Sequence, residues 1–287
     1  MPDDKRANRE EFCLAKSLSI EDAFSWTQSF VAREWRLLLP VALAFLALPP
    51  LMMDLLVPQS VWQALALAIQ SQNPQAASGA MQVVMPVMGV VLLIASFGGL
   101  TISAMALIPV ISVVEALSLA LRRLPTMLGA LLLVAAGQVL AAMVLTLIFA
   151  AAHLVGAGAQ SLLVLTVMGL TLFVTIRLIG LSPIIVTRRI SVISAIRESW
   201  HISQGAFWRI LGVILIYCLG ATVVMLAFDY AVGILLNLAM HSLGADELGR
   251  AVTAVVQRTV GAMMALGLHL LIAAVFRQLN DAPIRGI

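Results

Sequence analysis

The sequence predicts an all-α fold: a polytopic membrane bundle of six transmembrane helices with three amphipathic helices at the membrane interface. Two observations favour this class. Of the 287 residues, 62% are hydrophobic and only 11% are charged, whereas soluble proteins average roughly 45–50% apolar and about 25% charged residues. No Asp, Glu, Lys or Arg occurs between Asp54 and Glu115 or between Arg123 and Arg177. Each gap holds more than one span at roughly 20 residues per membrane crossing.

The six spans follow from these apolar stretches. In chain order we expect them at Leu37–Val57, Met81–Ile108, Met127–Ala152, Leu162–Val186, Ile210–Phe228 and Thr259–Phe276. Pro49 and Pro50 interrupt the first span and Pro183 the fourth. Membrane helices tolerate such breaks where neighbouring groups satisfy the freed carbonyls. We expect a single membrane domain at residues 19–278, between cytoplasmic segments at residues 1–18 and 279–287.

The distribution of Lys and Arg predicts the orientation. Basic residues precede the first span, follow the second at Arg122 and Arg123, separate the fourth from the fifth and follow the sixth, whereas residues 58–80 contain none. Because cytoplasmic loops carry the excess of Lys and Arg, both termini are predicted to be cytoplasmic. Arg258 falls on the opposite side. It is expected either to be solvated at the interface, separately from Asp229, or to reach that acid.

Three segments that begin at Ser19, Ser112 and Ser191 predict a threefold repeat. In each segment a β-branched residue follows the Ser, and an Ala stands four positions after the Ser. Ser is a preferred N-cap, and the apolar and basic faces that follow are typical of a helix lying in the membrane interface. Chance similarity among capped amphipathic helices is the alternative. The repeat units, each an interfacial helix and two spans, are expected at residues 19–111, 112–190 and 191–278.

The Trp and Arg residues near the predicted cytoplasmic boundaries are interpreted as interfacial anchors, since Trp favours the headgroup region. Trp200 is expected to face lipid and Arg197 the cytoplasm. Pro125 and Gly205 are expected to end the second and third interfacial helices. The full set of anchors is Trp26, Trp35, Trp200, Trp208, Arg122, Arg123 and Arg197.

Two linked patterns carry a family resemblance. The pattern R-L-x₄-P-x-x-V begins at Arg177, and A-x-x-x-S-W-x₄-G-x-x-W begins at Ala195. Together they resemble the bacterial six-helix proteins named for the glycerophosphodiester phosphodiesterase membrane domain and the related YciC-like proteins. The resemblance covers most of the chain and implies the bacterial inner membrane and a six-helix fold. In the named enzymes a soluble catalytic domain follows, and because this sequence ends at Ile287 that activity is not expected here.

The sequence lacks the common motifs of metal-binding, nucleophilic and nucleotide-binding sites. The four histidines include no i, i+4 pair, and H-E-x-x-H, G-x-S-x-G, P-loop and Cys-x-x-Cys patterns do not occur. Zinc hydrolases, serine hydrolases and nucleotide-binding enzymes depend on such spacings. We therefore expect no enzyme, metal, cofactor or nucleic-acid partner.

Arg177 is the most informative polar residue, because a charge inside a span is by default a functional hypothesis. Other polar residues fall at comparable depth on other spans. We expect them to converge with Arg177 on a polar pocket in the inner half of the bundle, where Arg177 binds an anion such as a lipid phosphate. The alternative is that Arg177 snorkels to the cytoplasm or has a structural role. The predicted cluster is Arg177, Gln138, Tyr217, His269, Thr101 and Ser103.

These features favour a non-enzymatic inner-membrane protein that contacts or organises lipids or partner membrane proteins. Its basic helices suit anionic headgroups of the cytoplasmic leaflet. The alternatives are a small-solute or lipid transporter and, third, an intramembrane lipid-modifying enzyme. A transporter predicts a water-accessible cavity past Arg177, a lipid organiser predicts lateral openings between spans, and an enzyme predicts converging acids or histidines.

Overall fold

The structure is a computed structural model that describes the chain except residues 1–18, 72, 152–156, 236–237, 239–245 and 281–287. The described part is all-α. Within the described residues, six helices are long and apolar enough to cross a membrane, which confirms the predicted polytopic bundle. They are Ile20–Leu56, Gln75–Leu107, Val113–Ala151, Ser161–Thr187, Phe207–Gly233 and Ala251–Asn280.

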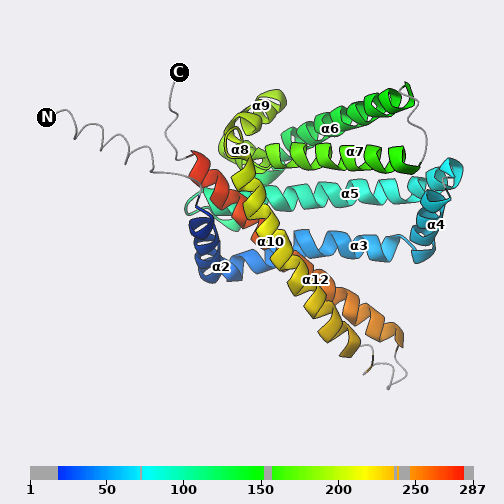
Figure 1. Ribbon diagram of the computed structural model, residues 1–287. Coiled ribbons are helices and arrows are strands. Elements are labelled where there is room, and N and C mark those ends of the chain that lie inside the picture. Colours follow the sequence, from blue (N-terminus) through cyan, green and yellow to red (C-terminus); the bar gives the residue numbers. More distant parts are fainter. Residues whose placement is uncertain (1–18, 72, 152–156, 236–237, 239–245, 281–287) are drawn as a thin grey trace.

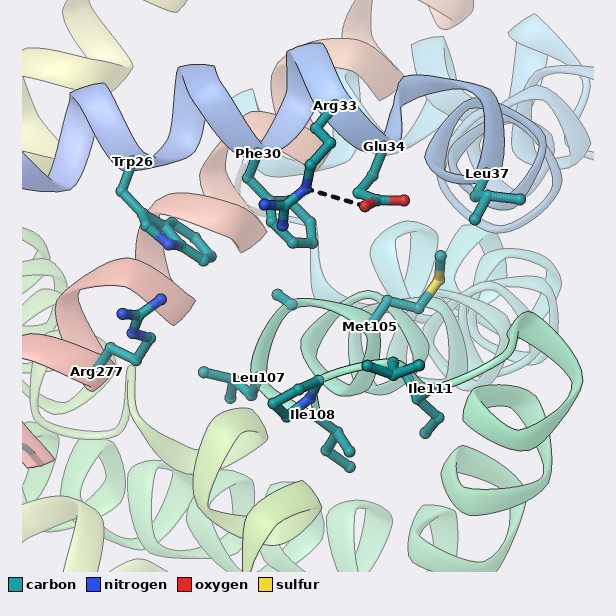
Figure 2. Close-up of a pocket in the computed structure, with 13 residues that line it drawn as sticks. Trp26, Phe30, Arg33, Glu34, Leu37, Met105, Leu107, Ile108, Ile111 and Arg277 are labelled. Carbon is teal, nitrogen blue, oxygen red and sulfur yellow. Dashed lines mark hydrogen bonds and ion pairs between the residues drawn. The ribbon is translucent and has the colours of Figure 1, made fainter.

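The first span changes direction along its length. α2 (Ile20–Ala42) continues through a π-helical turn, η1 (Leu43–Ala47), into α3 (Leu48–Leu56). Figures 1 and 2 show the first part of α2 lying across the direction of the helix that follows it. Pro40 lies inside α2, and its ring clashes with the carbonyl four residues earlier, which bends a helix. The first amphipathic segment therefore runs crosswise to its own span.

The three predicted helix starts form caps. The Ser19 side chain accepts a hydrogen bond from the Asp22 N–H, and the Ser191 side chain accepts one from the Ser194 N–H. Ser112 and Glu115 form a reciprocal capping box, in which each side chain accepts from the other residue's N–H at 3.2 and 2.9 Å. All three starts fall where the sequence pattern places them.

The ends of the second and third amphipathic helices differ from each other. α9 (Val192–Ile202) stops before Gly205, whose φ of +81° suits a residue without a Cβ. In contrast, α6 (Val113–Ala151) runs through Pro125 without a stop, so the expected termination there is wrong. α6 packs along α5, α8 and α9, and this packing holds the helix together across one missing backbone hydrogen bond.

The segment between the first two spans contains a helix that lies outside the six predicted spans. α4 (Gln59–Gln70) packs against α5 (Pro74–Leu107), and its Ala68 is buried. Residues 58–80 contain no charged side chains. The polar face of this amphipathic helix consists of Gln and Ser, so the segment lacks the charged face by which the other amphipathic helices were predicted.

The last helix, α12 (Asp246–Asn280), is the most buried of the described spans. It packs against α2, α5 and α10 (Phe207–Phe228), and 44% of its most apolar window is buried, whereas none of the corresponding window of α6 is. The Gln278 side chain donates to the Ser19 carbonyl and accepts from the Ser19 N–H, at 3.2 and 3.1 Å. The start of α2 and the end of α12 therefore lie at one end of the bundle.

Arg258 forms an ion pair that the sequence analysis did not predict. Its Nε and Nη2 donate to the two carboxylate oxygens of Asp54 at 2.6 and 2.7 Å. Both alternatives for Arg258, separate solvation or contact with Asp229, are therefore wrong. The partner is 204 positions away in the chain, and only the packing of α12 against α3 brings the two together.

Gly98 allows α5 to approach the π-helical turn of the first span. A Cβ at this position would overlap the Cβ of Phe45, whose ring packs edge-to-face with Phe97 at 5.1 Å. Gly89 lies on the same helix and has open space around its Cα.

We expect Gly98→Ala to lower the stability of the purified protein by about 1–3 kcal/mol, because the new methyl group forces the first span away from α5. Gly89→Ala is the matched control and should be neutral or slightly stabilising. Thermal unfolding in detergent measures both. Equal midpoints for the two variants would show that the close approach is not required.

Candidate functional site

The fourth span breaks at Arg177. α7 (Ala157–Arg177) ends there, residues 178–180 form a turn, and α8 (Leu181–Thr187) completes the span. Pro183, predicted to cause the interruption, lies in the first turn of α8, where its missing N–H is not needed. The break itself leaves carbonyl groups at the end of α7 without their intrahelical partners.

Ser199 of α9 and Ser203, the C-cap residue of α9, satisfy the freed Arg177 carbonyl. The Ser199 and Ser203 hydroxyls donate to it at 3.1 and 3.2 Å, and both serines are almost fully buried. An unsatisfied carbonyl inside a bilayer costs several kcal/mol. The spacing of four residues between the serines places both hydroxyls on one face of α9, toward the end of α7.

Three aromatic rings surround the Arg177 guanidinium. Its central carbon lies 5.3 Å from the ring centroid of Phe173, 5.2 Å from that of Trp200 and 5.6 Å from that of Phe207. These cation–π contacts are strongest where water is excluded. Nε and Nη1 are buried and have no hydrogen-bond partner among the residues that the structure describes. The rings therefore stabilise the charge but leave its donors unused. We call Phe173, Arg177, Ser199, Trp200, Ser203 and Phe207 the Arg177 site.

A cavity of about 520 Å³ opens beside the Arg177 site, between α7 and α10. Leu172 and Trp208 on its rim are 54% and 79% exposed, so the cavity opens sideways on the outer surface of the bundle. Its walls are apolar apart from the arginine. The lining residues are Gly169, Leu172, Phe173, Arg177, Phe207, Trp208 and Leu211.

The two linked sequence patterns meet at this site. The first contributes Arg177, and the second contributes Ser199 and Trp200 together with Trp208 on the cavity rim. Trp200 was expected to face lipid, but it packs over Arg177 and edge-to-face on Phe173 at 5.7 Å. The contact between Trp200 and Arg177 depends on how α9 packs against the end of α7. The residues near either position in the sequence do not predict it.

The structure does not gather the six predicted polar residues around one pocket. Ser103 contacts the Ser182 hydroxyl at 2.9 Å, next to Gly99, and a Cβ on Gly99 would lie 3.0 Å from the His269 ring. Ser103 and His269 therefore lie near each other, between α5, α8 and α12.

The other members of the predicted cluster lie elsewhere. Thr101 donates to the Phe97 carbonyl of its own helix, and Tyr217 donates to the Met264 carbonyl of α12. Gln138 is half-buried on α6. Within the described part of the chain, none of them bonds to the Arg177 side chain.

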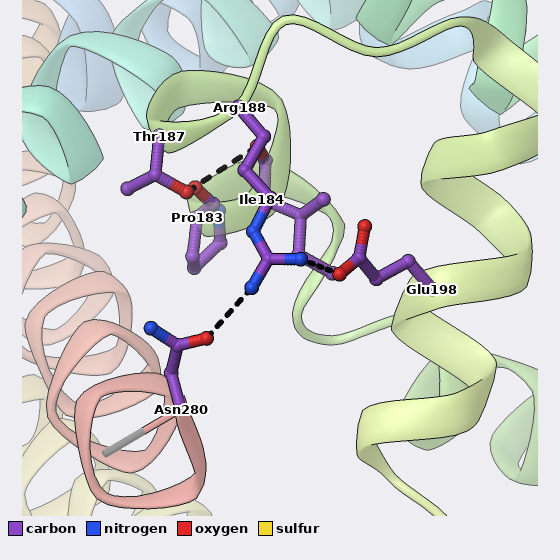
Figure 3. Close-up of polar contacts among 6 residues, drawn as sticks. All are labelled: Pro183, Ile184, Thr187, Arg188, Glu198 and Asn280. Atoms are coloured by element: carbon purple, nitrogen blue, oxygen red, sulfur yellow. Dashed lines mark hydrogen bonds and ion pairs between the residues drawn. The ribbon is translucent and has the colours of Figure 1, made fainter. Parts of the chain in front are cut away.

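Arg188, at the end of α8, joins three helices and was not singled out from sequence. Its Nη1 pairs with the Glu198 carboxylate of α9, and its Nη2 donates to the Asn280 side chain at the end of α12, at 2.9 Å (Figure 3). These contacts join α9 to the ends of α8 and α12. Of the predicted basic anchors, Arg122 and Arg197 are exposed and Arg123 is half-buried; the exposed Trp35 is also on the surface.

No protein-family model, curated protein or solved structure matches the chain. The resemblance to the six-helix inner-membrane proteins therefore stays a prediction. Among the described residues, no group of three or more His, Cys, Asp or Glu side chains is placed to hold a metal ion.

The two serines should share the support of the Arg177 carbonyl. We expect Ser199→Ala or Ser203→Ala alone to have a small effect, because the second hydroxyl remains. The double variant should lower stability by about 1–3 kcal/mol, the cost of leaving one buried acceptor unpaired. Thermal unfolding measures the series, with the exposed Ser194→Ala of the same helix as control. Additive losses from the two single variants would contradict shared support.

Proposed function

We propose that this membrane protein is a non-enzymatic lipid-binding protein of the bacterial inner membrane and that the Arg177 site binds the anionic headgroup of a phospholipid. The observation that carries the proposal is the guanidinium itself. It is charged, lies within a span, has two buried nitrogens without hydrogen-bond partners among the described residues, and borders a cavity on the side of the bundle. A phosphodiester supplies the acceptor oxygens that the aromatic rings do not.

The shape of the cavity supports a lipid rather than a soluble solute. Lateral openings between spans distinguish a lipid-contacting protein from a channel for solutes, and this cavity lies on the side of the bundle between α7 and α10. Its exposed rim residues, Leu172 and Trp208, are suited to acyl chains and to the headgroup boundary respectively. The basic residues near this end of the spans support a site in the cytoplasmic leaflet, because cytoplasmic segments carry the excess of Lys and Arg.

Native mass spectrometry of the protein purified from membranes tests the proposal. Wild type should retain phosphatidylglycerol in preference to phosphatidylcholine, and Arg177→Ala should reduce the retained anionic lipid about tenfold or more, as expected for loss of a charge-assisted contact. Arg122→Ala is the matched control, because it removes the same charge from an exposed position on α6 and should leave retention unchanged.

Arg177→Lys separates lipid binding from folding. Lysine keeps the charge and a cation–π contact but cannot form a bidentate pair with phosphate. Its thermal midpoint should stay near that of wild type, while lipid retention falls. Wild-type lipid retention in Arg177→Ala, accompanied only by a lower midpoint, would establish a structural arginine and contradict the proposed site.

A further inference from the structure

A second cavity, of about 460 Å³, lies at the end of the bundle where α2 begins and α12 ends. α2 forms one wall, the end of α5 and the connection to α6 form the floor, and Arg277 of α12 closes one side (Figure 2). This Arg277 pocket is separate from the Arg177 site, and none of its lining residues belongs to that site.

In the wall of the pocket two stacked aromatic rings lie between two arginines. The Arg277 guanidinium lies 5.3 Å from the Trp26 ring centroid, Trp26 stacks on Phe30 at 5.1 Å and 18°, and Arg33 lies 5.5 Å from the Phe30 centroid. Figure 2 shows both guanidinium groups beside the open space of the pocket. Stacking on a ring leaves the edge N–H groups of a guanidinium free for a planar, bidentate contact.

The charges of the pocket are not balanced. Arg33 pairs with Glu34 at 3.0 Å, and Glu34 is the one acid among the lining residues. Arg277 is exposed and forms no ion pair with any residue that the structure describes. Among the described residues, Arg277 therefore has no acidic partner, which favours an anionic ligand.

The floor of the pocket is apolar. Met105, Ile108 and Ile111 line it, and Val110 between them adopts a φ of +60°. A β-branched residue in the left-handed region is strained, and such residues cluster at ligand-binding positions. Because a cation stands at one side and apolar groups cover the floor, the pocket suits a ligand with an anionic end and an apolar body.

We infer that the Arg277 pocket binds a phosphate ester with an apolar body, with Arg277 as the phosphate-binding residue and the Trp26–Phe30 stack in contact with the body. The volume is within the range of small-molecule sites. Arginine forms two parallel hydrogen bonds to a phosphate, and its stacking on Trp26 orients the group before the ligand arrives. The ligand is either a phospholipid headgroup from the adjacent leaflet or a soluble organic phosphate.

Isothermal titration of the full-length protein in detergent with hexanoyl lysophosphatidic acid tests this inference. Wild type should bind the probe, and the uncharged monohexanoyl glycerol should not bind. Arg277→Gln should weaken binding about 10- to 100-fold, the loss expected for hydrogen bonds to a charged group. Arg189→Gln is the control, because it removes a charge from an exposed residue that does not line the pocket and should leave affinity unchanged.

Arg277 also lies in the last turn of α12, where a cation stabilises the helix end, so Arg277→Lys provides a variant that keeps the fold. It should retain the wild-type thermal midpoint and still bind the probe more weakly, since lysine lacks the planar fork. Equal affinity of wild type and Arg277→Gln, equal binding of the uncharged ester, or an equal loss in Arg189→Gln would overturn the inference.

The same assay in nanodiscs identifies the source of the phosphate. If phosphatidic acid in the bilayer abolishes binding of the soluble probe, the pocket takes a lipid headgroup. If the probe binds equally in discs with and without phosphatidic acid, the pocket takes a soluble ester. Arg277→Gln should cause the same loss of probe binding in an Arg177→Ala background as in wild type, so that failure of this site and failure of the Arg177 site are distinguishable.

Discussion

The break in the fourth span and the contacts that Arg177 makes across it determine how the second half of the molecule is arranged. A membrane helix cannot leave a carbonyl unpaired in the hydrocarbon region, so α9 must return to the end of α7 and supply the Ser199 and Ser203 hydroxyls. The same return places Trp200 over the guanidinium. Gly205, with its positive φ, then turns the chain into α10, which brings Phe207 to the third side of the charge.

The remaining helices hold this arrangement from behind. Ile176, next to the arginine, is buried in a cluster with Ala23 of α2, Ile210 of α10 and Leu271 of α12. Because α12 packs against α2, α5 and α10 and is joined to the start of α2 through Gln278, the position of the α7 end depends on elements from both ends of the chain. α6 and the first part of α7 contribute little to this core, and their sides remain available to lipid.

The sequence was sufficient for the features that depend on local physical chemistry. Apolar length predicted the spans, and Ser19, Ser112 and Ser191 marked helix starts because capping needs only residues a turn apart. Arg177 stood out because charge inside a span is rare. Contacts set by packing could not be predicted: the Asp54–Arg258 pair and the aromatic rings around Arg177 in place of the expected polar cluster. The α4 helix was missed for a different reason, because its polar face has no charged residues.

Both candidate sites use an arginine held against aromatic rings at a cavity, one opening sideways from the spans and one at the end of the bundle. We propose that the free N–H groups of the Arg177 guanidinium donate hydrogen bonds to a lipid phosphate. An experimental structure of the protein in nanodiscs that contain phosphatidylglycerol tests it most directly. The account predicts density for a headgroup in the cavity between α7 and α10, with phosphate oxygens within hydrogen-bonding distance of Arg177. A cavity filled only by acyl chains, with the guanidinium still bonded to nothing but its rings, would contradict it.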